Sequence, residues 1–192
     1  MKYIIEHLEQ EVGKWCVCEY THMAKCVGKD NLIISNVNKE DAAILPEGVK
    51  KVSERCNELG FDPSRVCLLD LRADKELSPE DLTEFDAVVF GGILGDHPPR
   101  DRTGCLRTHG FTTRVLGNRQ MSTDTAVLVC KTILEDGKKL SEIEFIDDIE
   151  LKTGEKDSTL LPYRYVATSE HKPLLADGLI EILRDDEENC LF

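Results

Sequence analysis

The sequence of 192 residues lacks the features that mark several common protein classes. It has no run of about 18 apolar residues, so we expect no membrane-spanning helix. Its start, MKYIIEHLEQEVG, turns acidic after four or five residues, a pattern that excludes a secretory signal peptide. The phosphate-binding motif G-x-x-x-x-G-K-S/T is absent, which argues against P-loop kinases and GTPases.

The cysteines show neither a metal-binding nor a disulfide pattern. None of the eight forms a C-x-x-C pair, and Cys16-x-Cys18 has no second pair at the spacing of a zinc site. In a chain without a secretory leader we expect reduced core thiols, a cytoplasmic location and no metal. The cysteines lie at positions 16, 18, 26, 56, 67, 105, 130 and 190.

Positive charge is scarce, since 24 lysines and arginines face 37 aspartates and glutamates, for a net charge of −13. Residues 141–192 carry 14 acidic and 5 basic side chains, whereas residues 97–119 carry five arginines and one aspartate. Proteins that bind nucleic acids usually present a basic surface, so no direct nucleic-acid partner is expected. The acidic body either attracts basic protein segments or only keeps the protein soluble.

The order of elements predicts an α/β fold with a mainly parallel sheet and helices on both faces. Apolar runs alternate with helical patterns, and such runs are typical of strands buried on both sides. Pro46 and Gly60 frame one expected helix, and Ser122 or Thr123 caps another. Strands are expected near 2–6, 31–37, 65–71, 86–90, 114–116, 143–148 and 162–167, and helices over 8–26, 46–60, 101–109, 122–134 and 173–184.

Ligands in such folds bind beyond the carboxyl ends of the strands. This rule selects Glu6-His7, the stretch GGILGD at 91–96 and the stretch LGNRQM at 116–121. Strand one has no glycine-rich loop, so a common dinucleotide site is not expected there. The late glycines either let the backbone hold a nucleoside-like ligand of little negative charge or form tight turns against a helix.

Two long motifs carry a specific resemblance. GGILGDHPPRDRT at 91–103 and RVLGNRQMSTDTAV at 114–127, preceded by MKYIIEH, resemble the SPOUT-class protein arginine methyltransferases of the yeast type. The likeness extends to PYRYV near residue 165. It implies one domain over 1–192, with a C-terminal deep trefoil knot near 86–136, an extension over 141–192, and S-adenosylmethionine bound by the knot loops.

The resemblance also implies the cofactor residues. One loop is Phe90, Gly91, Gly92 and Gly95, with Asp96 beside them. Free backbone amides at the start of the 122–134 helix would suit adenine or a carboxylate. The other cofactor positions are Leu116, Gly117, Gln120, Met121, Ser122, Thr123 and Thr125.

Methylation of a guanidinium calls for carboxylates that orient it and accept a proton, because its pKa lies above about 12. Glu19 is one candidate, because it falls in the apolar stripe of a helix, where a carboxylate is costly unless paired. Its alternative roles are a salt bridge to a core arginine or displacement by a kink at Gly13. The stripe comprises Leu8, Val12, Trp15, Glu19, Met23 and Cys26.

Other candidates flank the first loop. Glu6 ends strand one. Asp96 and Asp101 either clamp the substrate arginine or form ion pairs with Arg100 and Arg102. Asp101 could instead cap the next helix. His97, Arg100 and Asp124 are assigned to substrate binding. Asp96, His97 and Asp101 lack a second cluster, so no metal is expected. Arg100 and Arg102 either hold the cofactor carboxylate or stabilise the knot loops.

The sequence as a whole predicts a cytoplasmic protein arginine methyltransferase. The resemblance implies a small-subunit ribosomal protein as substrate, and such proteins are basic, in keeping with the acidic charge. The alternatives are an RNA methyltransferase of the same class and a non-catalytic ribosome-assembly module. We expect a monomer rather than a homodimer.

Overall fold

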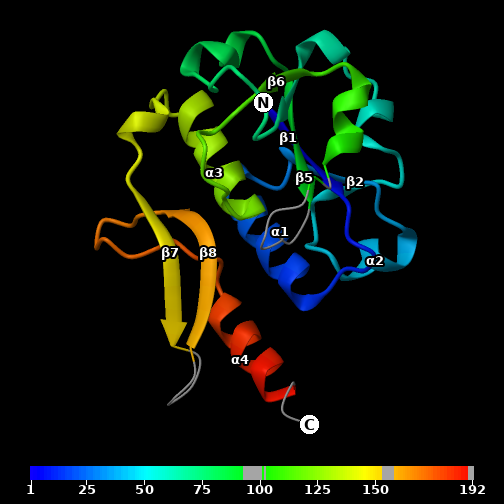
Figure 1. Cartoon of the computed structure of the whole chain (residues 1–192). Coiled ribbons are helices and arrows are strands. Elements are labelled where there is room, and N and C mark those ends of the chain that lie inside the picture. Colours follow the sequence, from blue (N-terminus) through cyan, green and yellow to red (C-terminus); the bar gives the residue numbers. More distant parts are fainter. Residues whose placement is uncertain (93–100, 102, 153–157, 190–192) are drawn as a thin grey trace.

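A computed structural model describes residues 1–92, 101, 103–152 and 158–189. Its centre is a six-stranded sheet in the order β3-β2-β1-β5-β4-β6, and every neighbouring pair is parallel. The predicted mainly parallel sheet is therefore confirmed (Figure 1). The strands are β1 Lys2–His7, β2 Leu32–Ser35, β3 Lys50–Lys51, β4 Val66–Leu69, β5 Ala87–Gly92 and β6 Thr112–Arg114.

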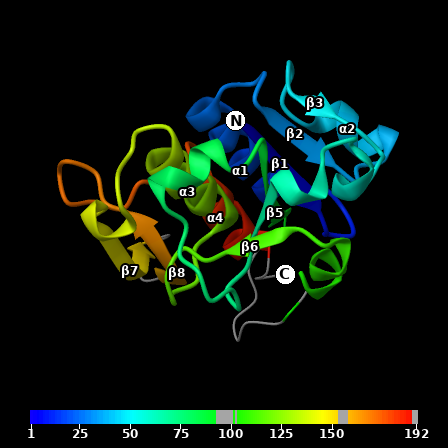
Figure 2. The same ribbon diagram turned by 90° about the horizontal axis from the view of Figure 1, so that it is seen from above.

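The two faces of the sheet are covered differently (Figures 1 and 2). Two long helices, α1 Lys14–Val27 and α3 Thr123–Leu134, pack together over one face. Short 3-10 helices, among them η1 Cys56–Glu58 and η4 Gly104–His109, place Cys56 and Leu106 in the core on the other face. Both faces of the sheet are thus apolar, as the unbroken hydrophobic strands predict.

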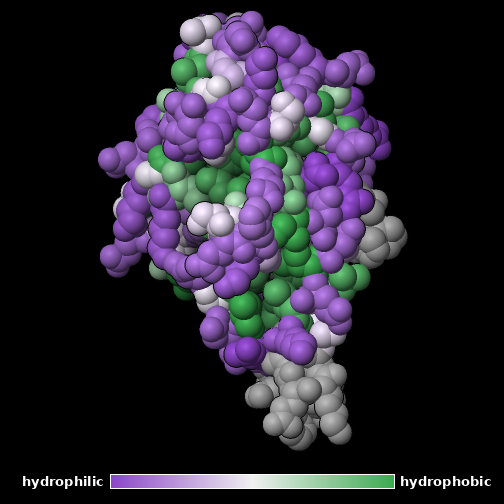
Figure 3. Space-filling model, turned by 90° about the vertical axis from the view of Figure 1, so that its left-hand side faces the viewer, coloured by the Kyte–Doolittle hydropathy of each residue, from purple (hydrophilic) through white to green (hydrophobic). Residues whose placement is uncertain are grey.

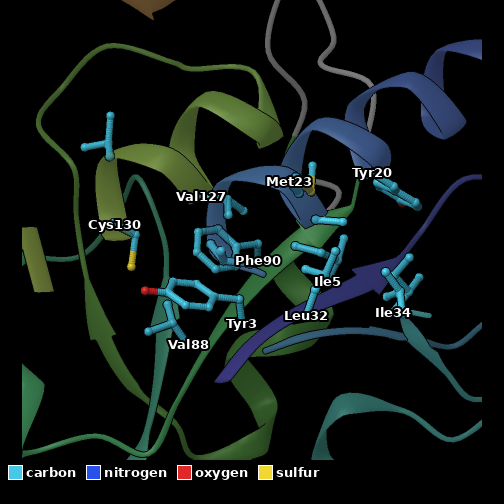
Figure 4. Close-up of a cluster of buried hydrophobic side chains, with 14 of the residues drawn as sticks. Tyr3, Ile5, Tyr20, Met23, Leu32, Ile34, Val88, Phe90, Val127 and Cys130 are labelled. Carbon is cyan, nitrogen blue, oxygen red and sulfur yellow. The ribbon is translucent and has the colours of Figure 1, made fainter. Parts of the chain in front are cut away.

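Side chains of alternate residues enter the two cores, because successive residues of a strand point to opposite faces. Tyr3 and Ile5 join the helix-covered core, whereas Ile4 joins the opposite one. Figure 4 shows side chains from the strands, such as Val88, gathered under Met23 and Val127 of the helices. The hydroxyl of Tyr3 donates a hydrogen bond of 2.8 Å to Glu135, which satisfies its one polar atom at the edge of this core.

The helix expected over 46–60 is wrong. That segment contains a turn with Gly48 at φ +81°, the short strand β3 and then η1. Pairing of β3 with β2 buries the backbone at the sheet edge, and this tertiary gain overrides the local helical pattern. A short helix, α2 Lys39–Ile44, precedes it and is capped by the side chain of Asn38.

The first helix is shorter than expected. It begins at Lys14 rather than near residue 8, because Gly13 adopts an extended conformation at the N-cap. The remaining 3-10 helices are η2 Pro63–Arg65, η3 Pro79–Thr83 and η5 Leu140–Glu142. None of the helices in the described residues is long and apolar enough to span a membrane.

The C-terminal part forms its own layer. Strands β7 Phe145–Lys152 and β8 Ser158–Val166 make an antiparallel hairpin, and α4 Leu179–Asn189 follows, six residues later than the predicted start at 173. Their apolar side chains pack with Cys18 and Trp15 of α1. Figure 3 views the side on which β7 lies and shows apolar atoms in a hollow bordered by hydrophilic ones.

A buried ion pair joins η3 to the end of β6. Asp81 is fully buried, and the Arg114 guanidinium donates to its two oxygens at 2.7 and 3.0 Å. Burial by itself would raise the pKa of Asp81, but hydrogen bonds from Arg114 and the Ser78 backbone outweigh it, and the pKa is lowered. The carboxylate is therefore charged in the folded protein and depends on its partner.

We predict that Arg114→Ala lowers the free energy of unfolding by about 3 kcal/mol, because the buried Asp81 carboxylate loses its bidentate guanidinium and keeps the exposed Lys75 ammonium at 3.6 Å as its cationic partner. Arg65→Ala is the matched control, since Arg65 also forks onto one carboxylate, that of Asp86 at 2.6 and 2.7 Å, but both side chains are exposed. This control should lower the stability much less, because exposed ion pairs contribute little to it. Urea denaturation measures both variants, and equal losses would contradict the account.

Candidate cofactor and substrate site

The carboxyl ends of the parallel strands meet at one edge of the sheet. Glu6 and His7 of β1 lie opposite Gly91 and Gly92 of β5. The chain turns back at this edge, where the Leu8 amide donates to the Gly92 carbonyl at 3.0 Å. Segments that are distant in the sequence therefore come together where ligands bind in such sheets.

A cavity opens between the ends of β4 and β5 and the start of α3. It unites five of the predicted cofactor residues, namely Phe90, Gly91, Leu116, Met121 and Thr123. The Thr123 hydroxyl donates to the Gly91 carbonyl at 3.4 Å, which ties the helix start to the strand end. The other residues that line the cavity are Leu69, Asp70, Leu71 and Ala126.

Gly92 is required by close packing beneath this edge. A Cβ atom there would lie 2.7 Å from both the Ile5 side chain and the Tyr20 hydroxyl, and 2.9 Å from the Glu6 carbonyl. These distances are shorter than any normal contact, so a larger residue would have to push β5 away from β1. Gly92 therefore allows β5 to pack closely against β1 at this edge of the sheet, and it is not a lining residue of the cavity.

The remaining predicted cofactor residues that the structure describes are not among those that line the cavity. Gly117 adopts a φ of +78°, a conformation that favours glycine. Gln120 accepts a backbone hydrogen bond from Arg164 at 2.9 Å. Ser122 is the N-cap of α3 and donates its hydroxyl hydrogen to Thr125 at 2.8 Å. Gly95 lies outside the described residues.

Asp70 was missed by the sequence analysis although it lines the cavity. Its carboxylate is buried and accepts a hydrogen bond of 2.9 Å from Arg107. The signal was present, because Asp70 directly follows an apolar strand, and the rule that selected the other strand ends applies equally to this one.

Asp101 lies in an ion network beside Asp70. It pairs with Arg107, and also with Arg72 at 3.1 Å. The sequence suggested Arg100 and Arg102 as partners instead. Those two arginines lie outside the described residues. A role for Asp101 as a substrate clamp stays a prediction.

Glu19 is buried at the junction of α1 and α3. Its carboxylate accepts a hydrogen bond of 2.7 Å from the Trp15 indole, rather than a salt bridge from a core arginine. Burial and the charge of Asp124 raise the pKa of Glu19 to about 8, against weaker opposing hydrogen bonds from Trp15 and the Asp124 backbone. A carboxyl group that titrates near neutral pH can both hold and release a proton there.

Asp124 forms the second half of this buried group. Its carboxylate lies 2.8 Å from Nδ1 of His22, and this hydrogen bond, with a weaker one to Cys26, raises the pKa of His22 to about 10. The pair is therefore an imidazolium and a carboxylate at the first turn of α3. Since the Asp124 backbone hydrogen-bonds to Glu19, the protein itself already uses one of the amides expected to be free for a ligand.

Comparison of this chain with proteins of known sequence and structure identifies its family. A family model described as "Protein arginine N-methyltransferase SFM1-like" matches residues 2–190. The chain belongs to this family. It is 38% identical, over 208 aligned residues, to protein arginine N-methyltransferase SFM1 of Saccharomyces cerevisiae, covering 100% of this chain and 98% of the yeast protein.

Solved structures agree with the SFM1-like assignment and with the predicted SPOUT fold class. The yeast arginine methyltransferase SFM1 complexed with SAM superposes with a TM-score of 0.90 at 38% identity, over 97% of this chain and 91% of that one. The complex with SAH gives 0.87 at 39% identity, over 95% and 94%. The knot expected near 86–136 includes residues outside the described ones and stays a prediction.

Glu6 is not among the residues that line the cavity of this SFM1-like chain. Its carboxylate is buried and accepts hydrogen bonds from the Ser35 hydroxyl at 2.6 Å and the Cys56 amide at 2.9 Å. These contacts tie β1 to β2 and η1 on the sheet face opposite α1 and α3. A catalytic role for Glu6 stays a prediction, and its contacts give it a structural one.

Three predicted residues cannot be placed, because Asp96, His97 and Arg100 lie outside the described residues. Within the ranges that are described, no group of three or more histidine, cysteine, aspartate or glutamate side chains could hold a metal ion. A metal site involving Asp96 and His97 falls outside those ranges.

We predict a pH-dependent difference in stability between the wild-type protein and Glu19→Gln. The pKa of Glu19 is raised from 4.5 to about 8 on folding, so the folded state binds its proton more tightly. Wild-type stability should therefore fall as the pH rises through this range, and the Gln variant should lack that part of the decline. Melting temperatures at pH values between 5 and 8.5 measure the effect.

The control for this comparison is Glu11→Gln, because Glu11 is exposed and precedes the same helix. Its melting temperature should follow the wild type at every pH. A Glu19→Gln protein that tracks the wild type equally closely would show that Glu19 does not titrate in this range.

Proposed function

We propose that this protein transfers a methyl group from S-adenosylmethionine to an arginine side chain of a small-subunit ribosomal protein in the cytoplasm, and that it acts as a monomer. The observation that carries the proposal is the cavity between β4, β5 and α3. Both family motifs contribute to it, through Phe90 and Gly91 from one and Leu116, Met121 and Thr123 from the other. SFM1-like membership supports the reaction class.

The residues of the cavity fit the cofactor. Apolar side chains of Leu69, Phe90 and Leu116 provide surfaces for an adenine ring, and the Asp70 carboxylate is an acceptor for hydroxyl groups. A Cβ atom on Gly91 would collide with the Thr103 side chain, so this wall is formed by bare backbone. When bound, S-adenosylmethionine supplies a methyl group on a positively charged sulfur.

The chain itself must dispose of a proton, since a guanidinium loses one when it gains a methyl group. We propose Glu19 for this role, because its pKa near 8 suits proton transfer at neutral pH. It hydrogen-bonds to Asp124, the residue after Thr123 of the cavity. Asp124, held by His22, would orient the substrate together with His97 and Arg100, and Asp96 would clamp the guanidinium.

Charge supports a basic protein substrate. The net charge of −13 gives long-range attraction for the arginine-rich segments of ribosomal proteins. The arginines 107, 114 and 119 of the basic segment are paired with Asp70, Asp81 and Asp148 respectively. Arginines engaged in this way are less available to phosphates, so the RNA alternative receives little support.

We predict that the protein, incubated with methyl-labelled S-adenosylmethionine and unmethylated ribosomes, labels a protein of the small subunit. The label should resist ribonuclease, disappear with protease and be recovered as methylarginine after hydrolysis. Label released by ribonuclease would instead establish an RNA methyltransferase. Absence of any label would favour the non-catalytic assembly module.

A matched pair of variants tests whether the cavity is responsible. Ala126→Trp fills the cavity and should reduce labelling at least tenfold, whereas Ala43→Trp adds the same side chain at an exposed position of α2 and should not. Circular dichroism verifies that both variants fold. Full activity of a folded Ala126→Trp protein would place the cofactor elsewhere.

A further inference from the structure

A second pocket lies at the same edge of the sheet, between the ends of β1 and β2 and the start of α2. Its wall is polar, with two carboxylates and several amide groups, and no lysine or arginine is among the described residues that line it. A pocket of this composition is suited to a cation rather than to an anion. It is lined by His7, Glu9, Gln10, Asn36, Val37, Asn38, Asp41 and Ser53.

His7 gives this pocket an unsatisfied polar atom. The residue is 4% exposed, and its Nδ1 lies 2.8 Å from the Tyr20 hydroxyl. Its Nε2 is buried and has no hydrogen-bond partner among the described residues. Buried polar atoms are nearly always paired, so an unpaired nitrogen on a residue that lines a pocket points to a ligand that supplies the missing partner.

The two carboxylates are the negative charges that act most strongly on His7, with Asp41 ahead of Glu9. Asp41 is held in place by Asn38, whose Nδ2 donates to its carboxylate at 2.7 Å and whose Oδ1 accepts from its amide at 2.8 Å. Burial lowers the pKa of His7, so the imidazole is neutral at neutral pH and does not cancel these charges.

The floor of the pocket is also fixed. Asn36 has a φ of +59°, and its side-chain amide donates to the His7 carbonyl at 2.7 Å. This bond joins the ends of β1 and β2, so the pocket is formed before a ligand arrives. Preformed sites bind with less loss of conformational freedom.

The pocket adjoins the cofactor cavity through the sheet register. His7 pairs with Gly92, and the neighbouring Gly91 lines the cofactor cavity. Adjacent strands are about 4.8 Å apart, so the two sites occupy neighbouring strand ends. A side chain held in one site would keep its peptide beside the other.

We propose that this second pocket binds an arginine side chain of the protein substrate, with Asp41 and Glu9 facing the guanidinium and Nε2 of His7 meeting a polar atom of the same peptide. The identity of the peptide as a methylation substrate rests on the proposed function. The pocket itself rests on the contacts of His7, Asn36 and Asp41.

Binding is tested with the peptide acetyl-Gly-Arg-Gly-amide, titrated into the full-length protein labelled with nitrogen-15 in its five histidines. The imidazole signals of His7 should shift with the arginine peptide and stay unchanged with the citrulline peptide of the same shape. Equal shifts with both peptides, or no shift at His7, would overturn the proposal.

Two neighbouring residues of α2 provide the matched variants. Asp41→Asn should weaken binding of the arginine peptide roughly three- to tenfold, because it removes one charged partner of the guanidinium. Glu40→Gln removes the same charge from an exposed residue outside the pocket lining, and it should change the affinity less than about twofold. If the two variants weaken binding equally, the peptide is attracted only by the overall negative charge, and the proposed pocket is wrong.

The two proposals fail in different ways. If ribosomal protein is labelled but His7 does not respond to the arginine peptide, the pocket is wrong and the function stands. If His7 responds and no protein is labelled, the pocket stands and the proposed function is wrong.

Discussion

The parallel pairing of β1 with β5 determines where the cofactor cavity and the second pocket lie. It joins Lys2–His7 to Ala87–Gly92 across some 85 residues of chain, and both strands are fully embedded in the sheet. The pairing places His7 against Gly92, and thereby sets the polar pocket beside the cofactor cavity. A side chain at Gly92 would disturb both sites, because its Cβ atom would collide with Ile5, Tyr20 and the Glu6 carbonyl.

Buried charge stabilises the parts that flank this pairing. Asp81 and Arg114 hold the far edge of the sheet, and Asp124 with His22 joins α3 to α1. Both pairs are largely desolvated, so each charge depends on its partner. Glu19 differs from them, since its carboxylate accepts a hydrogen bond from the uncharged Trp15 indole and its pKa is raised to about 8.

The positions of most strands and the cofactor edge could be predicted because they depend on local patterns. Apolar runs such as Val66–Leu69 mark strands. The end-of-strand rule selected the stretches 91–96 and 116–121, and these supply Gly91, Leu116 and Met121 to the cavity. The helix expected over 46–60 was wrong because pairing of a short edge strand has no local signal. The partners of Glu19 and Asp101 could not be predicted either, since Asp124 and Arg72 reach them only through the folded chain.

We propose that the cofactor lies in the cavity at the carboxyl ends of β4 and β5. A crystal structure of this protein grown with S-adenosylhomocysteine tests it most directly. We expect the ligand to contact Leu69, Phe90, Leu116 and Met121 and to approach the Asp70 carboxylate. A ligand bound between β1 and β2, or on the β7–β8 hairpin, would contradict it.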